Sequence, residues 1–176
     1  MKTSVAVLKL WSSLAALLLI GIDQLLKLWI AGTMQLFESI PVIPGVLHIT
    51  YVLNDGAAFS FMAGQSWLLC GVTSLLMVVL TWLFYSRFVR QPLCIYGIAL
   101  ILSGGIGNLI DRVFRGERLF HGRVVDYVDF RLINFAVFNF ADCCVVVGTG
   151  LIMLYLILSD KKKKQNAPPC EDACHE

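Results

Sequence analysis

Two aspartates in the last third of the sequence have the surroundings expected of catalytic carboxyl groups. Asp126 lies among apolar neighbours in the connection before the last long apolar run, and Asp142 lies at the start of that run, so both can face one water-accessible pocket at the same depth. Two neighbouring carboxyl groups tend to share one proton, so that one acts as a base toward water and the other as an acid toward a carbonyl. The pair predicts aspartic-protease chemistry, with Asp129 as a competing carboxylate three residues after Asp126.

Polar residues earlier in the chain each allow a structural or a functional interpretation. Asp23 and Lys27 are four residues apart, so they can form an ion pair on one face of a helix and end that helix at a membrane interface. Asn54 and Gly56 belong to the sequence N-D-G, which is an ordinary turn but also allows the backbone to approach a ligand closely.

A third polar group follows three closely spaced glycines at positions 104, 105 and 107. Glycines at such spacing allow neighbouring helices to pack closely. Asn108, Asp111 and Arg112 then share one helix face, because their spacings are three and four residues. An Asp and an Arg at a helix end are usually structural, so we expect a scaffolding role for Asp111 and Arg112.

The sequence lacks the patterns of rival catalytic chemistries. No serine lies in a G-x-S-x-G context, and H-E-x-x-H is absent. Four of the six cysteines lie in or beside apolar runs, where cysteine behaves as a small buried hydrophobic residue. Cys170, Cys174 and His175 are one ligand short of a structural zinc site. We therefore expect no metal and no organic cofactor.

Four apolar stretches are long enough to position these residues at a membrane. A helix needs about 20 apolar residues to cross the hydrocarbon core, and the expected helices cover residues 5–22, 67–85, 91–110 and 141–159. No A-x-A cleavage site follows the first stretch, so it does not have the pattern of a removable signal peptide.

Hydrophobic residues make up 58% of the chain and charged residues only 15%, which indicates a membrane protein. The net charge of +2 offers no broad basic surface, so nucleic acid is not an expected partner.

The Lys and Arg residues of the short loops predict the orientation. If there are four spans, Lys2, Lys9, Arg87, Arg90 and Lys161–Lys164 lie on one side, which we expect to be the cytoplasm. Two long outer connections remain, and the first contains residues 40–52, whose Ile, Val, Thr and Tyr content predicts short strands at the membrane face.

The expected fold is therefore all-α and integral to the membrane, with a small β cradle and a loop at the outer face. Residues 1–159 form the membrane domain, and residues 160–176 form a disordered cytoplasmic tail.

Five sequence motifs, in order, resemble those of the lipoprotein signal peptidases, also called signal peptidase II: D-Q-L-L-K from Asp23, N-D-G-A-A-F-S from Asn54, G-G-I-G-N-L-I-D-R from Gly104, V-V-D-Y from Val124 and F-N-F-A-D from Phe138. In that family the catalytic aspartates lie in the V-V-D and A-D motifs, which correspond here to Asp126 and Asp142. The resemblance further implies that these catalytic aspartates are surrounded by residues that bind substrate or support the site: Asp23, Lys27, Asn54, Gly56, Asn108, Asp111, Arg112, Asn139 and Ala141.

The resemblance also implies the substrate and the location. The substrate is a prolipoprotein whose cysteine carries a diacylglyceryl group, and cleavage just before that cysteine releases the signal peptide. The enzyme is expected as a monomer in the bacterial inner membrane, in contact with lipid, with both termini in the cytoplasm and the active site at the outer face. This chain departs from the family pattern at Leu26, in a longer segment at Glu117–His121, and in its cysteine-bearing tail.

A proton or cation relay in a non-enzymatic membrane protein is the main alternative. Such a relay should spread acidic residues through the depth of the membrane. Here the second and third predicted spans contain no acidic residue, and the acids cluster at one face. A lipoprotein is not predicted either, because the first cysteine, Cys70, comes too late in the chain. Among these interpretations, peptidase chemistry agrees best with the placement of the carboxyl groups.

Overall fold

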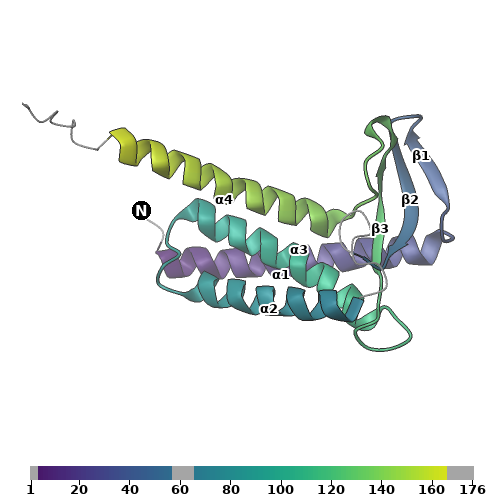
Figure 1. The fold of residues 1–176 in the computed structure, drawn as a ribbon, viewed down its shortest axis with the longest axis horizontal. Helices are drawn as coiled ribbons and strands as arrows, with labels where there is room; N and C mark the ends of the chain where they lie inside the picture. The colour runs from purple at the N-terminus through teal and green to yellow at the C-terminus, as the bar shows by residue number, and fades with distance from the viewer. Residues whose placement is uncertain (1–3, 57–65, 166–176) are drawn as a thin grey trace, which may run out of the picture.

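The computed structural model describes residues 4–56 and 66–165, in which four long helices carry a three-stranded antiparallel sheet at one end (Figure 1). The helices are α1 (Val5–Thr33), α2 (Ser66–Tyr85), α3 (Pro92–Phe114) and α4 (Phe140–Gln165). Each is long and apolar enough to cross a membrane. The predicted fold class is confirmed. Residues 57–60 of the N-D-G-A-A-F-S motif, and Cys170, Cys174 and His175, lie outside the described residues.

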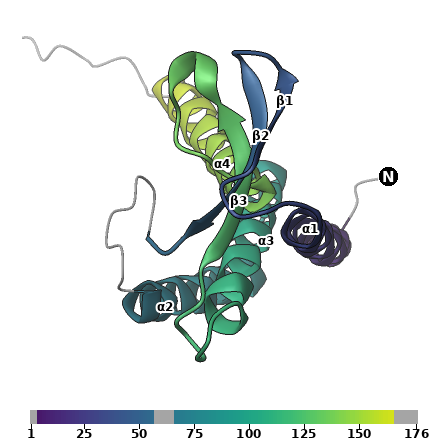
Figure 2. The same cartoon turned by 90° about the vertical axis from the view of Figure 1, so that its right-hand side faces the viewer.

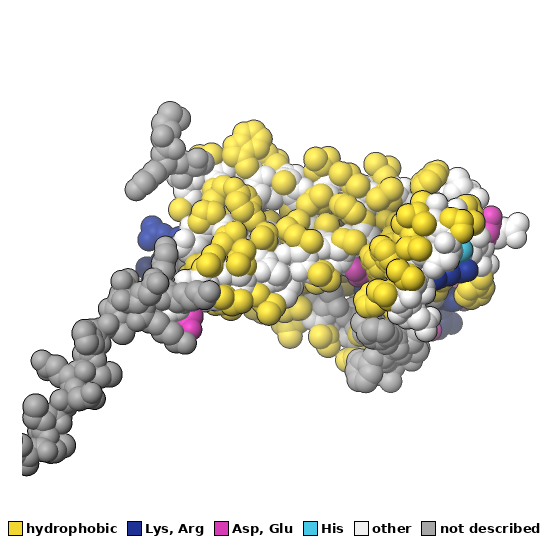
Figure 3. All heavy atoms as spheres, turned by 90° about the horizontal axis from the view of Figure 1, so that it is seen from above, with side chains coloured by type: hydrophobic (Ala, Val, Ile, Leu, Met, Phe, Trp, Pro, Cys, Tyr) yellow, Lys and Arg dark blue, Asp and Glu magenta, His cyan; other side chains and the backbone are white. Residues whose placement is uncertain are grey.

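The helices face outward with hydrophobic side chains over most of their length. Figure 3 shows this apolar surface, and the charged side chains visible on that face gather near the two ends and beside the sheet. Trp11 and Trp82 are exposed toward one end of the bundle, and Trp29 and Trp67 toward the other. Tryptophan prefers the two membrane interfaces. The pattern is that of a protein whose solvent is lipid.

Helix α1 is longer than the sequence predicted, because it continues past Ile22 to Thr33. The prediction assumed that Asp23 and Lys27 would end the helix at the interface. Both residues are instead buried within it, at 1% and 0% exposure, where they pair with each other and Lys27 also pairs with Asp111 of α3. Likewise α3 extends past Ile110, and α4 continues past Ser159 to Gln165, into the segment that was predicted to be a disordered tail.

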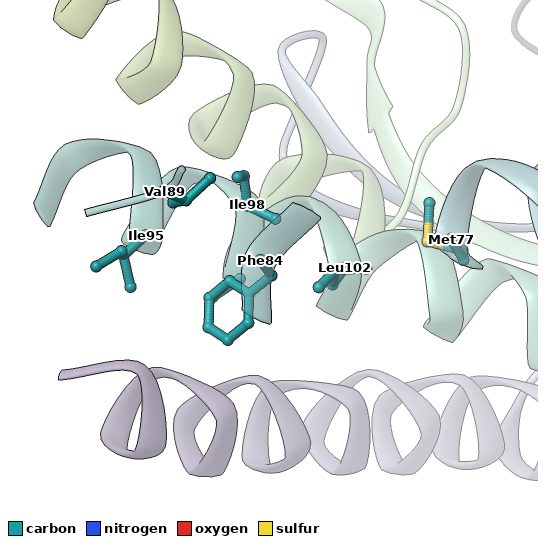
Figure 4. Packing of buried hydrophobic residues seen from close by; sticks show 7 residues of the cluster. Met77, Phe84, Val89, Ile95, Ile98 and Leu102 are labelled. Carbon is teal, nitrogen blue, oxygen red and sulfur yellow. The ribbon is translucent and has the colours of Figure 1, made fainter. Parts of the chain in front are cut away.

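Helix α3 lies at the centre of the bundle and packs against the three other helices (Figure 2). A hydrophobic cluster joins it to α2, and its members include Phe84 and Met77 of α2 and Ile98 and Leu102 of α3 (Figure 4). On the side toward α4, Gly104 lies so close to the Ala141 carbonyl oxygen that a side chain at position 104 would collide with it. This close approach brings Asn108, one helical turn further along α3, to the start of α4.

The sheet contains β1 (Ser39–Ile43), β2 (Leu47–Asn54) and β3 (Val124–Phe130), in the order β1-β2-β3. The predicted β cradle is confirmed, although its third strand, β3, was not predicted. Ile30 and Met34 at the end of α1 pack against Val125 and Tyr127 of β3, which fixes the sheet to the bundle. The sheet thus holds β3 at the ends of the helices that carry the polar motifs.

Candidate active site

Strand β3 buries Asp126 at the junction of the sheet and the helices. The side chain is 3% exposed. Asn54 Nδ2 donates a hydrogen bond to one carboxyl oxygen at 2.9 Å, and Asn139 Nδ2 donates to the other at 2.6 Å. Asn54 lies on the neighbouring strand β2, and its own Oδ1 accepts a bond from the Gly56 backbone N–H at 2.9 Å. The N-D-G sequence therefore orients the amide that contacts Asp126.

The first turn of α4 holds Asp142 through a reciprocal pair of hydrogen bonds with Asn139. The Asn139 backbone N–H donates to Asp142 Oδ2 at 3.0 Å, and the Asp142 backbone N–H donates to Asn139 Oδ1 at 3.1 Å. This is the geometry of a capping box, which satisfies two amide groups at the start of a helix. Asn108 Nδ2 donates to Asp142 Oδ1 at 2.8 Å. The helix N-terminus and both donors stabilise an ionised carboxylate at Asp142.

Asn139 joins the two aspartates, because it bonds Asp126 through its side chain and Asp142 through its backbone. Asp129 does not compete for this position. Successive side chains of a strand alternate between its faces, so Asp129 and Asp126, three residues apart, point in opposite directions. Asp129 accepts hydrogen bonds from Thr50 at 2.7 Å and from Arg131 at 3.0 Å.

The pKa of Asp126 is raised to about 6, chiefly by burial and also by the negative charge of Asp142, and this value includes the opposing effects of the hydrogen bonds from Asn54 and Asn139 and of the charge of Lys27. A carboxyl group in this range can hold a proton near neutral pH, as a general acid must. A pair with one proton bound near neutral pH is the state that aspartic-protease chemistry uses.

The raised pKa has a consequence for stability. The folded protein binds the Asp126 proton more tightly than the unfolded chain, whose carboxyl pKa is near 3.8. The free energy of unfolding should therefore fall as pH rises from 4 to 7, by up to roughly 3 kcal/mol from this group. Thermal unfolding in detergent at several pH values should show this loss in the wild type, and Asp126→Asn should lack that component. An identical pH dependence in the two proteins would contradict the assignment.

A buried layer of charges lies directly beside this pair. Lys27 Nζ forms ion pairs with Asp23 at 2.9 Å and with Asp111 at 2.8 Å, and it donates a hydrogen bond to Asn108 Oδ1 at 2.8 Å. Because Lys27 takes the Asn108 oxygen, the amide NH₂ of Asn108 must face Asp142. Asn139 Nδ2 donates to the same oxygen at 3.1 Å, so Lys27 and Asn139 together determine which end of Asn108 meets the carboxylate.

The remaining predicted residues are hydrogen-bonded to the same site. Asp23 Oδ1 accepts a hydrogen bond from the Ala141 backbone N–H at 3.1 Å, which connects α1 to the start of α4. Arg112 donates to the Gly56 carbonyl oxygen at 3.1 Å and to the Asn108 carbonyl oxygen at 3.4 Å. The structure therefore gathers all the predicted site residues into one connected network at the end of the bundle.

Sequence reasoning missed two members of this network. Arg115 forms an ion pair with Asp111 Oδ1 at 2.6 Å and donates to Gln24 Oε1 at 3.3 Å. Gln24 in turn donates to Asp23 and to the Gly107 carbonyl oxygen, both at 3.1 Å. Two features of the sequence could have identified them. Gln24 lies within the D-Q-L-L-K motif, and Arg115 follows Asp111 by four residues, the spacing of an ion pair on one helix face.

Comparison with known proteins yields consistent matches over most of the chain. The family model described as signal peptidase (SPase) II matches residues 15–158. A lipoprotein signal peptidase of Desulfitobacterium hafniense (strain DSM 10664 / DCB-2) is 41% identical over 148 residues, which cover 82% of this chain and 91% of the relative. That of Clostridioides difficile (strain 630) is 43% identical, covering 86% and 97%. A bacterial membrane enzyme solved by the in meso method at 2.3 Å superposes with a TM-score of 0.78 at 32% identity, covering 89% of this chain and 93% of that chain.

Proposed function

The chain belongs to the signal peptidase II family, and we propose that Asp126 and Asp142 are its catalytic pair. As a member of this family it is a membrane aspartic endopeptidase, which removes signal peptides from diacylglyceryl-modified prolipoproteins by cleaving before the lipidated cysteine. The observation that carries the assignment of the pair is the position of Asn139. This one residue bonds both carboxyl groups and holds them beside each other at the end of the bundle.

In the proposed mechanism water is the nucleophile and no covalent intermediate forms. Asp142, ionised, removes a proton from water, and the resulting hydroxide attacks the carbonyl carbon before the lipidated cysteine. Asp126, protonated, gives its proton to the carbonyl oxygen, which yields a tetrahedral diol. The C–N bond then breaks as Asp142 passes its proton to the departing amine nitrogen, while a hydroxyl of the diol returns a proton to Asp126. The products are a signal peptide carboxylic acid and a lipoprotein with a free amino group.

The environments of the two aspartates support this division of roles. The start of α4 and the Asn108 donor favour the charged form of Asp142. Burial favours the neutral form of Asp126, since it raises the pKa to about 6. A charged carboxylate can remove a proton from water and a neutral carboxyl group can donate one, so these environments assign Asp142 as the base and Asp126 as the acid.

The other polar residues would support or line the site. Asn108 and Asn139 orient the pair, and Asn54 holds Asp126 from the sheet side. Arg112 fixes the Gly56 carbonyl, and with it the start of the segment beyond β2. Asp23, Lys27, Asp111 and Ala141 connect α1, α3 and α4 behind the pair.

The protein is a multi-pass membrane protein, and the proposed location is the bacterial inner membrane. Residues 1–159 would form the peptidase domain and residues 160–176 a cytoplasmic tail. The distribution of Lys and Arg supports cytoplasmic termini and an active site at the outer face. There the diacylglyceryl chains can stay in the bilayer while the peptide bond reaches the aspartates, and a monomer suffices because both aspartates come from one chain.

A reporter that is active only outside the cytoplasm should be inactive when fused to the C-terminus, and an active fusion would reverse this orientation.

The function is tested by a gel-shift assay with the purified chain in detergent. A prolipoprotein that carries the diacylglyceryl group should be shortened to the mature form, while the same precursor without the lipid should stay intact. Mass spectrometry of the product should place the cut before the modified cysteine. No cleavage of a verified lipidated substrate would favour the proton or cation relay, and trapping of an acyl-enzyme would exclude water as the direct nucleophile.

A further inference from the structure

A cleft with basic walls lies beside the catalytic network, in the connection between α3 and β3, and has Arg115 in common with that network. Its volume is about 640 Å³, and its lining residues are Leu53, Arg115, Gly116, Glu117, Arg118, His121 and Arg123. This volume falls within the range of roughly 300–1,000 Å³ that is common for ligand sites. Three arginines against one glutamate leave the cleft positive even when His121 is neutral. The cleft therefore suits an anion.

The connection that forms the cleft is anchored to the end of α3. The Gly122 backbone N–H donates to the Arg112 carbonyl oxygen at 2.8 Å, and the Arg123 N–H donates to the Arg115 carbonyl oxygen at 3.2 Å. A side chain at position 122 would collide with backbone oxygens at the end of α3, so glycine is required where the connection folds back against that helix. The basic side chains thus project from a defined turn rather than from an extended segment.

Two of the arginines are available for a ligand. Arg115 is already engaged by Asp111 and Gln24. Arg118 and Arg123 are exposed, and among the described residues no acidic side chain forms an ion pair with either of them. Guanidinium groups bind phosphate in a planar, bidentate geometry. The unengaged pair supplies the charge that a phosphate would need.

The position of the cleft identifies the source of the anion. Figure 2 shows the connection between α3 and β3 at the periphery of the bundle, beside the end of α3 and near α2. The same connection and the adjoining end of α3 expose Phe114, Leu119 and Phe120. Exposed aromatic and aliphatic side chains beside arginines are typical of segments that lie at the headgroup level of a bilayer. The diacylglyceryl group of the substrate has no phosphate, so the substrate lipid would leave these arginines unpaired.

We propose that this cleft, with Arg118 and Arg123, binds the phosphate headgroup of an anionic phospholipid, while Phe114, Leu119 and Phe120 contact its acyl chains. The site is separate from the aspartate pair and goes beyond the peptidase function. It would hold the rim of the active site at a fixed depth in the membrane, because the connection continues directly into β3 and Asp126.

The test is photo-crosslinking of the full chain in neutral detergent with phosphatidylglycerol that carries a photoreactive group near its headgroup. The labelled peptide should contain residues of 114–123, and unlabelled phosphatidylglycerol should compete for it while phosphatidylcholine does not. In the double variant Arg118→Gln/Arg123→Gln, half-saturation should require about 30-fold more lipid, as expected for two lost basic contacts at a membrane surface. The variant's thermal unfolding midpoint should equal that of the wild type, since both side chains are exposed.

The matched control is Arg87→Gln/Arg90→Gln, which removes two exposed arginines from the connection between α2 and α3, at the other end of the bundle. It should leave labelling of residues 114–123 unchanged. Equal competition by phosphatidylcholine, or equal labelling of the two double variants, would overturn the proposal. Competition by inorganic phosphate at the same concentration as phosphatidylglycerol would identify a free-anion site and overturn the lipid assignment. Stronger competition by an acidic peptide would likewise replace the lipid with a protein partner.

Discussion

Replacing Asp142 with asparagine is expected to lower the cleavage rate of a lipidated prolipoprotein by at least about 1,000-fold, because the amide cannot accept the proton of the attacking water. The new amide can turn its single oxygen toward either Asn108 Nδ2 or the Asn139 N–H, so one of the two hydrogen bonds is kept, and the Asp142 backbone N–H still donates to Asn139 Oδ1. The fold should therefore persist. Asp126→Asn should cause a loss of similar size, because the carbonyl oxygen then lacks its proton donor. Gel-shift cleavage under single-turnover conditions measures both effects.

Two comparisons make this prediction specific to the pair. The double variant should be no slower than either single variant, because residues that act as one unit lose their effect together. Asp129→Asn should keep cleavage within a few-fold of the wild type, because Asp129 bonds Thr50 and Arg131 on the opposite face of the strand. Full activity of Asp142→Asn would leave the peptidase function intact and show the proposed pair to be wrong. A thermal unfolding midpoint far below that of the wild type would attribute the loss to unfolding instead.

Lys27→Met should cause the largest loss of stability, about 3–5 kcal/mol. The lysine is fully buried between Asp23 and Asp111, and its removal leaves two buried carboxylates without this partner. Asp111 keeps Arg115, whereas Asp23 keeps only neutral donors, from Gln24 and the Ala141 backbone. Cleavage should fall as well, because only the hydrogen bond from Asn139 Nδ2 to Asn108 Oδ1, at 3.1 Å, then holds the Asn108 NH₂ toward Asp142. Thermal unfolding in detergent, followed by circular dichroism, measures the first effect.

The matched control is Lys9→Met, the same substitution on the same helix. Lys9 is also buried, but its ammonium group donates to a carbonyl oxygen of Ser86 at 2.8 Å and forms no ion pair among the described residues. Lys9→Met should lower the free energy of unfolding by about 1–2 kcal/mol, the range of a single hydrogen bond. The double variant Asp23→Asn/Lys27→Met should recover part of the stability that Lys27→Met loses, because it removes one unpaired charge. Equal losses in the two lysine variants would show that the ion pairs contribute little.

Local signals in the sequence were sufficient for the membrane fold and for the identity of the catalytic candidates. Apolar stretches of membrane-spanning length predict the helices, since such a run has few alternatives to a spanning helix. The placement of Asp126 and Asp142 at one face predicted aspartic chemistry, and the ordered motifs named the family. The first helix was predicted too short because a charged residue in an apolar run normally indicates the interface. The partners that make Asp23 and Lys27 tolerable within the helix lie more than 80 residues away.

The arrangement of the aspartates was decided only by the tertiary structure. Spacing along the chain could not separate Asp126 from Asp129, because the distinction depends on which face of β3 meets the helices, and β3 itself was not predicted. Nor could it assign the orientation of the Asn108 amide, which Lys27 of α1 and Asn139 at the start of α4 determine together. Sequence alone therefore determines which groups are available and at which end of the bundle they lie. Their proximity, protonation and orientation arise from contacts between distant segments, which form only when α1, α3, α4 and β3 pack together.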